Sequence, residues 1–381
     1  MELEICSSIK DIHKDQWHNW FGSDYPFLRY DFLKGLEETG CTNANTGWQP
    51  CHLILREGDT VIGVAPGFLK DHSYGEYVFD WAWADAWQRH GLQYYPKLVT
   101  AAPFTPATGP RLWLNPEVDS AAAKLVSAVQ QFCEQKGLSG WHVLFTERSQ
   151  GAQLDALGLH PRQTTQFHWF NRGYASFDDF LAMFSSRKRK NLKKERARVR
   201  EQGLTLETKS GDAITSADWS FFHHCYQTTY AKRSGHGGYL SRRFFTDTCP
   251  TLGDAVVMVV ARKNDQPVAA ALYFRSNNTL FGRYWGCLQE YEFLHFEACY
   301  YQGIEYCIAN GLEHFDPGAQ GEHKIQRGFE PILTRSSHWI VESGFDEAIA
   351  HFCARECEQV QGYRDDARTL LPFRDGAVAL N

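Results

Sequence analysis

Residues 312–329 read LEHFDPGAQGEHKIQRGF and combine a short predicted strand with a dense group of charged side chains. The strand is expected to end at Asp316, because Pro317 has no backbone N–H for the ladder and Gly318 permits a positive φ. Open α/β sheets hold their ligands just past the carboxyl ends of strands. The stretch is therefore the candidate site; the alternative interpretation is a solvated, capped helix start.

The length and composition of the chain predict a globular protein of two domains. Its 381 residues exceed one ordinary hydrophobic core, and 43% of them are hydrophobic. The eleven cysteines include no Cys-x-x-Cys pair, which favours a reducing compartment. No signal-peptide pattern and no run of eighteen apolar residues occurs. We expect a cytoplasmic protein without a membrane span, and no pattern indicates its oligomeric state.

Two parts of the sequence share one order of predicted elements. Each part begins with a hairpin and a third strand, over residues 51–55, 61–69 and 74–83 in the first and 255–261, 268–274 and 280–286 in the second. Each continues with a helix, a Gly stop and a strand, over 121–135, Gly137 and 141–145 in the first and 296–309, Gly311 and 314–315 in the second. The shared order indicates a tandem duplication with a boundary near residues 175 to 200.

A further pair of motifs supports the duplication. Gly-x-x-Pro at 158–161 precedes His168-Trp169 with the same spacing as Gly-x-x-Pro at 328–331 precedes His338-Trp339. Each repeat is thus an antiparallel meander, a crossover helix and a parallel strand, which is the element order of the acetyltransferase (GNAT) fold. We predict an α/β (α+β) protein of two tandem GNAT-like domains, each a mixed sheet flanked by helices. Their predicted bounds are 1–180 and 204–381, joined by a basic linker helix over 181–203.

Several long and unusual strings connect the chain to a known family. They are HSYGEYVFDWAW at 72–83, YYPK at 94–97, PFTPATGP at 103–110, FHWFNRGY at 167–174, SSRKRK at 185–190, GRYWGC at 282–287, LHFE at 294–297 and the opening stretch. With these strings the sequence resembles the FemAB-like group of predicted N-acyltransferases, which have two tandem GNAT-like domains. The resemblance covers nearly the whole chain.

This resemblance implies an N-acyltransferase of the EC 2.3 class. GNAT relatives use acyl-CoA, whereas Fem enzymes move an amino acid from aminoacyl-tRNA to an amine of a peptidoglycan precursor. We expect acyl-CoA as the donor, aminoacyl-tRNA as the alternative, and a small-molecule or peptide amine as the acceptor. A non-catalytic GNAT-fold binding protein is the third interpretation. The turn over 288–295 has two acids and no glycine, which departs from the Gly-rich turn that cradles the CoA pyrophosphate.

Residues 187–200 carry nine basic residues and one acid on a chain of net charge −6. The absence of Pro and Gly from 178–200 predicts a helix. Its thin apolar seam consists of Leu181, Phe184, Leu192 and Val199. The run is either a solvated linker or a phosphate contact for a cofactor tail or a tRNA backbone. In the second interpretation the donor contacts are Arg187, Lys188 and Lys190.

Acylation of an amine requires a base for the ammonium proton and a donor near the developing oxyanion. The candidate bases are His295, Glu297, Asp316, Glu322 and His323. The candidate contacts to substrate or donor are Arg283, Tyr284, Trp285, Gln320, Lys324 and Arg327. Strand alternation places Arg283 and Trp285 on one face and Tyr284 on the other. The histidines lack zinc-ligand spacing, so no metal is expected.

The duplication offers an internal comparison for the site. At the point equivalent to the opening stretch, the first repeat has residues 146–151, without the His-Lys pair and the later Arg. The same scaffold thus carries different chemistry at the strand end. We expect the active site in the second repeat, facing the inter-domain groove, with the first repeat as its structural partner.

Overall fold

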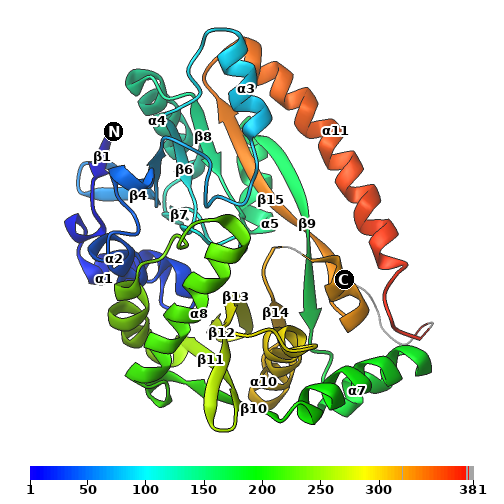
Figure 1. Ribbon diagram of the computed structural model, residues 1–381. Helices are drawn as coiled ribbons and strands as arrows, with labels where there is room; N and C mark the ends of the chain where they lie inside the picture. The colour runs from blue at the N-terminus through cyan, green and yellow to red at the C-terminus, as the bar shows by residue number, and fades with distance from the viewer. Residues whose placement is uncertain (320, 375, 377–381) are drawn as a thin grey trace. The chain divides into compact units, whose positions relative to one another are not determined.

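The computed structural model describes residues 1–319, 321–374 and 376, and the chain forms two compact units (Figure 1). One unit contains Met1–Thr164 and Leu333–Gly362, and the other contains Thr165–Ile332 and the described residues from Tyr363 onward. These units differ from the predicted division into residues 1–180 and 204–381. Each unit takes one strand from the other half of the sequence: the first takes the strand over residues 333–340, and the second takes the strand over residues 165–170. We call these two the closing strands. In the part of the chain that is described, no helix is long and apolar enough to cross a membrane.

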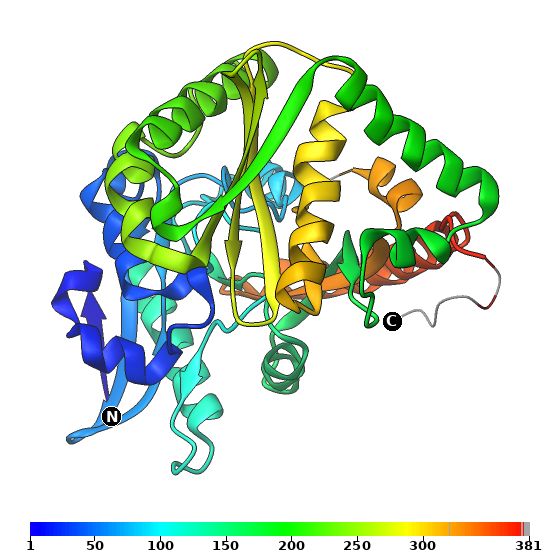
Figure 2. The ribbon, with the colours of Figure 1, turned by 90° about the horizontal axis from the view of Figure 1, so that it is seen from below.

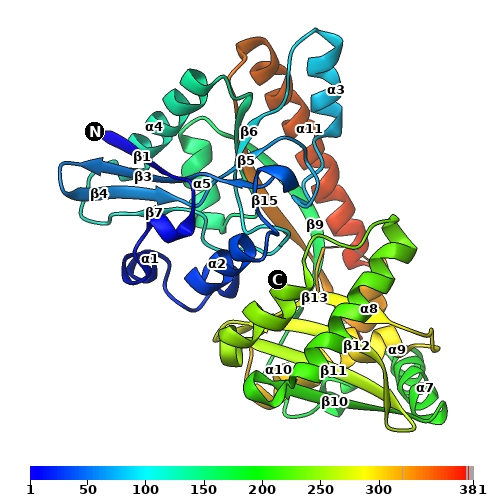
Figure 3. The same cartoon turned by 60° about the vertical axis from the view of Figure 1, so that its left-hand side comes forward.

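The first unit holds two sets of paired strands, and one of them contains a parallel pair (Figure 3). Its helices are α1 (Lys14–Phe21), α2 (Tyr30–Glu38), α3 (Trp81–Arg89), α4 (Ala121–Lys136), α5 (Arg148–Ala156) and most of α11 (Ser343–Arg368). One set has the order β1 (Glu2–Cys6), β3 (His52–Glu57), β4 (Thr60–Ala65), β7 (Trp113–Leu114). The other has the order β15 (Glu330–Ile340), β8 (Gly140–Val143), β6 (Lys97–Thr100), β5 (Phe68–Lys70), β2 (Gln49–Pro50). β6 and β8 run parallel, joined through α4 as a crossover helix.

The predicted aromatic third strand over 74–83 is wrong. Residues 71–80 form no regular strand, and α3 begins at Trp81. Gly75 and Tyr77 adopt positive φ angles, which interrupt an extended chain. Glu76 and Asp80 turn inward instead, and both accept hydrogen bonds from the buried Lys97. Pairing of two acids with a buried lysine thus outweighs the strand propensity of the aromatic residues.

The second unit is built on one mixed sheet with helices on both faces (Figure 2). Its strand order is β10 (Leu204–Ser210), β11 (Val256–Lys263), β12 (Gln266–Arg275), β13 (Thr279–Cys287), β14 (His314–Asp316), β9 (His160–Phe170). Its helices are α6 (Phe177–Ala182), α7 (Ser186–Glu201), α8 (Ser216–Ser234), α9 (Leu294–Phe296), a π-helical turn (Glu297–Tyr301) and α10 (Gln302–Asn310). β13 and β14 pair in parallel, across the helical crossover from Leu294 to Asn310. The predicted meander and crossover of the second repeat are therefore confirmed.

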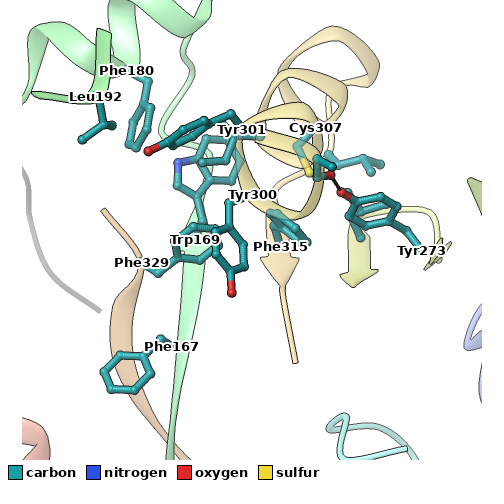
Figure 4. Packing of buried hydrophobic residues seen from close by; sticks show 14 of the residues in the cluster. Phe167, Trp169, Phe180, Leu192, Tyr273, Tyr300, Tyr301, Cys307, Phe315 and Phe329 are labelled. Atoms are coloured by element: carbon teal, nitrogen blue, oxygen red, sulfur yellow. Dashed lines mark hydrogen bonds between the residues drawn. The ribbon is translucent and has the colours of Figure 1, made fainter. Parts of the chain in front are cut away.

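The core of the second unit joins residues that are distant in the sequence (Figure 4). Trp169 of β9, Phe315 of β14 and Phe329 are almost completely buried together. Tyr273 donates a hydrogen bond to the carbonyl of Ala298 in the π-helical turn. Each such fully buried side chain stabilises the fold by about 1.5–3 kcal/mol. The sheet end that carries the candidate site therefore lies against a closely packed core.

The closing strands place the repeated His-Trp pairs at equivalent positions. Trp169 lies opposite Phe315 in the β9–β14 pair, and Trp339 lies opposite Trp141 in the β15–β8 pair. The repeated motif thus marks the strand that completes each sheet. This arrangement explains why His-Trp recurs at a fixed distance from Gly-x-x-Pro.

Candidate functional site

The parallel pair of β13 and β14 is short and ends at Asp316. Its last paired residues are Phe281 and Asp316, after which the chain turns at Pro317-Gly318 while β13 continues to Cys287. The β12–β13 register shifts so that Arg283 is an extra residue between Gly282 and Tyr284. Bulges of this kind redirect side chains and are frequent beside active sites. The end of the parallel pair is thus an irregular place in an otherwise regular sheet.

Asp316 is a buried carboxylate at this strand end. Its Oδ1 accepts a hydrogen bond of 2.8 Å from the backbone N–H of Gly318. Nε2 of His168 lies 3.4 Å from the same oxygen. Burial raises the pKa of Asp316, while the Gly318 N–H, Arg283, His314 and Lys324 oppose that shift. Its environment therefore makes the carboxylate a stronger base than an exposed aspartate.

Lys324 is buried beside the same turn. It lies in the 3₁₀ segment Glu322–Arg327, and its Nζ donates a hydrogen bond of 2.6 Å to the carbonyl of Gly318. Burial lowers the pKa of Lys324 to about 8. Gly318 thus contacts the carboxylate through its N–H and the ammonium group through its carbonyl. The pKa of the acid is raised and that of the amine is lowered, which is the pattern of an acid–base pair at a catalytic site.

An aromatic cluster contains the two predicted histidines. Nε2 of His323 lies 2.8 Å from the hydroxyl of Tyr300, and the ring of His295 lies 5.3 Å from that of Tyr300. Trp285 contacts His295, with 5.5 Å between the ring centroids. Burial lowers the pKa of His295 to about 3 and that of His323 to about 4, so both rings are neutral at neutral pH. Tyr300 lies in the π-helical turn and was not among the residues predicted from the sequence.

Two of the predicted bases are engaged elsewhere. Glu297 is buried and forms a two-pronged ion pair with Arg196, at 2.8 and 3.0 Å. Glu322 is exposed and accepts a hydrogen bond of 2.5 Å from the hydroxyl of Tyr363. Neither carboxylate is in contact with Asp316 or Lys324 in the described residues. Among the predicted bases, the geometry therefore favours Asp316.

The predicted contact residues take different places. Arg327 stacks over the ring of Phe296 at 3.4 Å and pairs with Glu195 at 2.9 Å, so its charge is already balanced. Tyr284 packs against Tyr226 of α8 while Trp285 packs against His295, so the two lie on opposite faces as predicted. Arg283, at the bulge, influences the pKa values of Asp316 and Lys324.

Gln320 lies outside the described residues. Among the residues that are described, no group of three or more His, Cys, Asp or Glu side chains has the geometry to hold a metal ion.

The basic run forms the predicted helix, with a break. α6 and α7 are separated at residues 183–185, and the seam residues Leu181, Phe184, Leu192 and Val199 are all buried. Lys188 donates a hydrogen bond to Gln326, while Arg187 and Lys190 are exposed. The helix is therefore packed on the second unit through its seam. Lys188 and Arg196 also bond to that unit, whereas Arg187 and Lys190 are exposed.

Comparisons with known proteins agree on the family and the fold. A family model, FemAB-like, described as peptidoglycan biosynthesis/recognition, matches residues 8–375. A crystal structure of FemX is similar at 12% identity with a TM-score of 0.54, over 92% of this chain and 100% of that one. L-PGS from Bacillus licheniformis is similar at 10% identity with a TM-score of 0.50, over 84% of this chain and 95% of that one.

A third similar structure is a tandem GNAT protein from the clavulanic acid biosynthesis pathway, at 10% identity and a TM-score of 0.45, over 90% of this chain and 98% of that one. No curated protein matches the chain. The predicted fold, two tandem GNAT-like units of α/β class, is confirmed.

Proposed function

Because the chain belongs to the FemAB-like family of peptidoglycan biosynthesis and recognition, we propose that it is an N-acyltransferase that transfers an acyl group to an amine. The observation that supports this most is the placement of Asp316 and Lys324 on the two sides of the Gly318 peptide. Both groups lie just past the end of a parallel strand pair, where α/β sheets hold ligands.

The pair supplies what amine acylation needs. Asp316 takes a proton from the acceptor ammonium, and the free amine then attacks the carbonyl carbon of the donor. The C–N bond forms, and the charge on the carbonyl oxygen is stabilised by the Lys324 ammonium group in a site of low dielectric. When the bond to the leaving group breaks, the second proton of the attacking nitrogen passes to the leaving thiolate or alkoxide, and Asp316 releases the first proton to water. No covalent intermediate with the protein is needed.

We propose acyl-CoA as the donor and keep aminoacyl-tRNA as the alternative. In the turn before α9, Glu290 and Glu292 form ion pairs with Lys232 and Arg198, so this turn is not a simple phosphate cradle. The exposed basic face of α7, which includes Arg187 and Lys190, is the proposed phosphate contact for either donor. An increase in melting temperature with acetyl-CoA or longer acyl-CoAs supports the first donor, and an increase only with charged tRNA supports the second.

The catalytic proposal is tested with Asp316→Asn, which keeps the shape of the side chain and removes the base. Thiol release from acetyl-CoA and longer acyl-CoAs is measured with a panel of amines, and transfer from charged tRNA is measured in parallel. We expect a loss of about 10²–10⁴-fold in kcat with unchanged donor binding. Glu322→Gln, on the neighbouring exposed acid, is the matched control and should retain activity. Unchanged turnover in Asp316→Asn would contradict the assignment, and donor binding without turnover in the wild type would favour a binding protein.

A further inference from the structure

Two histidines from different strands form a chain that reaches Asp316. His168 is buried on β9, and His314 lies on β14 two residues before the carboxylate. Nδ1 of His168 lies 2.7 Å from Nε2 of His314. On its other side, Nε2 of His168 lies 3.0 Å from Oε1 of Gln166 and 3.4 Å from Oδ1 of Asp316. Neither histidine has a role in the reaction outlined above.

The neighbours of His168 determine its tautomer. Nε2 faces the oxygen atoms of Asp316 and Gln166, so it carries the hydrogen. Burial, reinforced by Lys324, lowers the pKa of His168 to about 3, so the ring is neutral at neutral pH and Nδ1 holds a lone pair. Nε2 of His314 then donates to that lone pair. Hydrogen-bond donation therefore runs in one direction, from His314 through His168 to Gln166, with Oδ1 of Asp316 beside the same N–H at 3.4 Å.

The contacts of Asp316 with Gly318 and His168 both involve the same carboxylate oxygen. Oδ1 accepts from the N–H of Gly318 and faces His168, which distinguishes it from Oδ2. We propose that His168 is a positioning residue that holds Oδ1 of Asp316, so that Oδ2 is the atom that takes the acceptor's proton, and that His314 fixes the tautomer of His168. The inference deepens the proposed function and rests on Asp316 as the base.

The first unit contains the same scaffold with the carboxylate replaced. His142 follows Gly137 by five residues, as Asp316 follows Gly311. His338, on the closing strand of the first unit, pairs with His142, with 2.7 Å between the two Nδ1 atoms. In each unit, the histidine of the His-Trp motif thus lies beside the residue five positions after the helix-ending glycine. Of these two histidines, His168 is the one that faces an acid there, which argues for a function in the second unit beyond packing.

The charged and titratable groups around Asp316 come from four elements. Arg283 projects from β13, Lys324 from the 3₁₀ segment, His314 from β14 and His168 from β9. Arg283 and Lys324 act through charge and both favour the ionised carboxylate. The Nε2–H group of His168 bonds to Gln166 at 3.0 Å and lies 3.4 Å from Oδ1 of Asp316, so its dipole adds to this field and favours the ionised carboxylate.

The test follows the carboxylate itself and requires no substrate. The full chain is labelled with ¹³C-aspartate, the Asp316 carboxyl signal is assigned with Asp316→Asn, and its titration is measured by NMR. We expect His168→Phe to raise the pKa of Asp316 by up to about one unit, since the N–H dipole that faces the charged form is lost. His168→Gln retains an N–H donor and should restore most of the shift. His338→Phe removes the equivalent buried histidine of the first unit and should leave the titration of Asp316 unchanged.

An unchanged titration in His168→Phe would overturn the proposal. If that variant does not fold, His314→Phe replaces it: loss of the donor to Nδ1 releases the tautomer, and the pKa of Asp316 should again rise. No change in that variant would equally overturn the proposal.

The acyl-CoA assay separates this inference from the proposed function. Activity retained by Asp316→Asn would refute the base and with it the positioning role. Inactive Asp316→Asn together with an unchanged titration in His168→Phe would refute the positioning role alone.

Discussion

Asp316 and Lys324 are both removed from water without forming an ion pair with each other. Asp316 accepts a hydrogen bond from the N–H of Gly318, and Lys324 donates one to the carbonyl of Gly318. These bonds satisfy one polar atom of each side chain and compensate each charge only partly. Burial of ionisable groups in this way costs stability, and the group responds by a shift of its pKa toward neutrality. Proteins tolerate this loss of stability mainly at functional sites. The pair is therefore a chemical signal for a functional site.

We expect the rate of transfer to depend on the positive charge of Lys324. Lys324→Met is expected to lower kcat by about 10²–10³-fold, because a donor to the oxyanion is lost. Lys324→Arg should not restore the rate, since the larger planar guanidinium group does not fit the position of a buried ammonium group. Steady-state thiol release measures both. Lys14→Met, which breaks a surface ion pair with Asp31, is the control; a fully active Lys324→Met would contradict the prediction.

The pKa shifts predict a bell-shaped dependence of the rate on pH. Asp316 acts in its ionised form, so kcat/KM should rise with pH through a pKa above that of an ordinary aspartate. Lys324 acts in its protonated form, so the rate should fall as the pH passes about 8. The fall at high pH should be absent from the residual activity of Lys324→Met. A wild-type rate that remains constant from pH 7 to 10 would contradict the role of Lys324.

Glu297 should prove important for stability. Its buried carboxylate balances Arg196, which keeps only Glu305 as a carboxylate partner when Glu297 is removed. Glu297→Ala is expected to lower the free energy of unfolding by about 3 kcal/mol, as for other broken buried pairs. Denaturant unfolding measures the change. Glu292→Ala breaks the exposed pair with Arg198 and should have a much smaller effect; equal effects would show that burial is not the cause.

At the scale of elements, the alternation of apolar residues and the glycines that end helices predicted most of the structure. The features that were not predicted depend on pairing between residues distant in the sequence. The second meander, both crossover helices and the seam of α7 agree with the sequence patterns. The strand predicted over 74–83 failed because its acids face a lysine on β6. His168 approaches Asp316 from β9, a neighbour in space that lies almost 150 residues earlier in the chain. The recurring His-Trp pair was the sequence pattern that indicated this contact. The role of its histidine depends on which residue lies opposite on the neighbouring strand.

The loop 71–80 should depend on Lys97. This lysine is completely buried and bonds Ser73, Glu76 and Asp80, so Lys97→Met leaves two buried acids without their main partner. We expect a loss of about 3–5 kcal/mol in the free energy of unfolding. Lys124→Met, which breaks a surface pair with Glu57, is the control. A stability equal to that of the control would mean that the network does not hold the loop.

At the scale of the whole molecule, the two halves of the sequence are not two independent folding units. Residues 333–340 of β15 complete the strand set that contains β8, and residues 165–170 of β9 complete the sheet that contains β14. We expect residues 1–180, expressed alone, to lack a cooperative thermal transition by circular dichroism. Addition of residues 328–362 through a flexible linker should restore the transition. A cooperative transition in the isolated segment would contradict this dependence.

The exchange of closing strands also sets an order of events during synthesis. β8 emerges from the ribosome almost 200 residues before its partner β15, so one edge of its sheet remains open through most of translation. Open edges can pair with other chains, and contacts between distant segments form slowly. The first unit is therefore the first to be made and among the last to be completed, and the cell must protect its unpaired edge until the closing strand arrives.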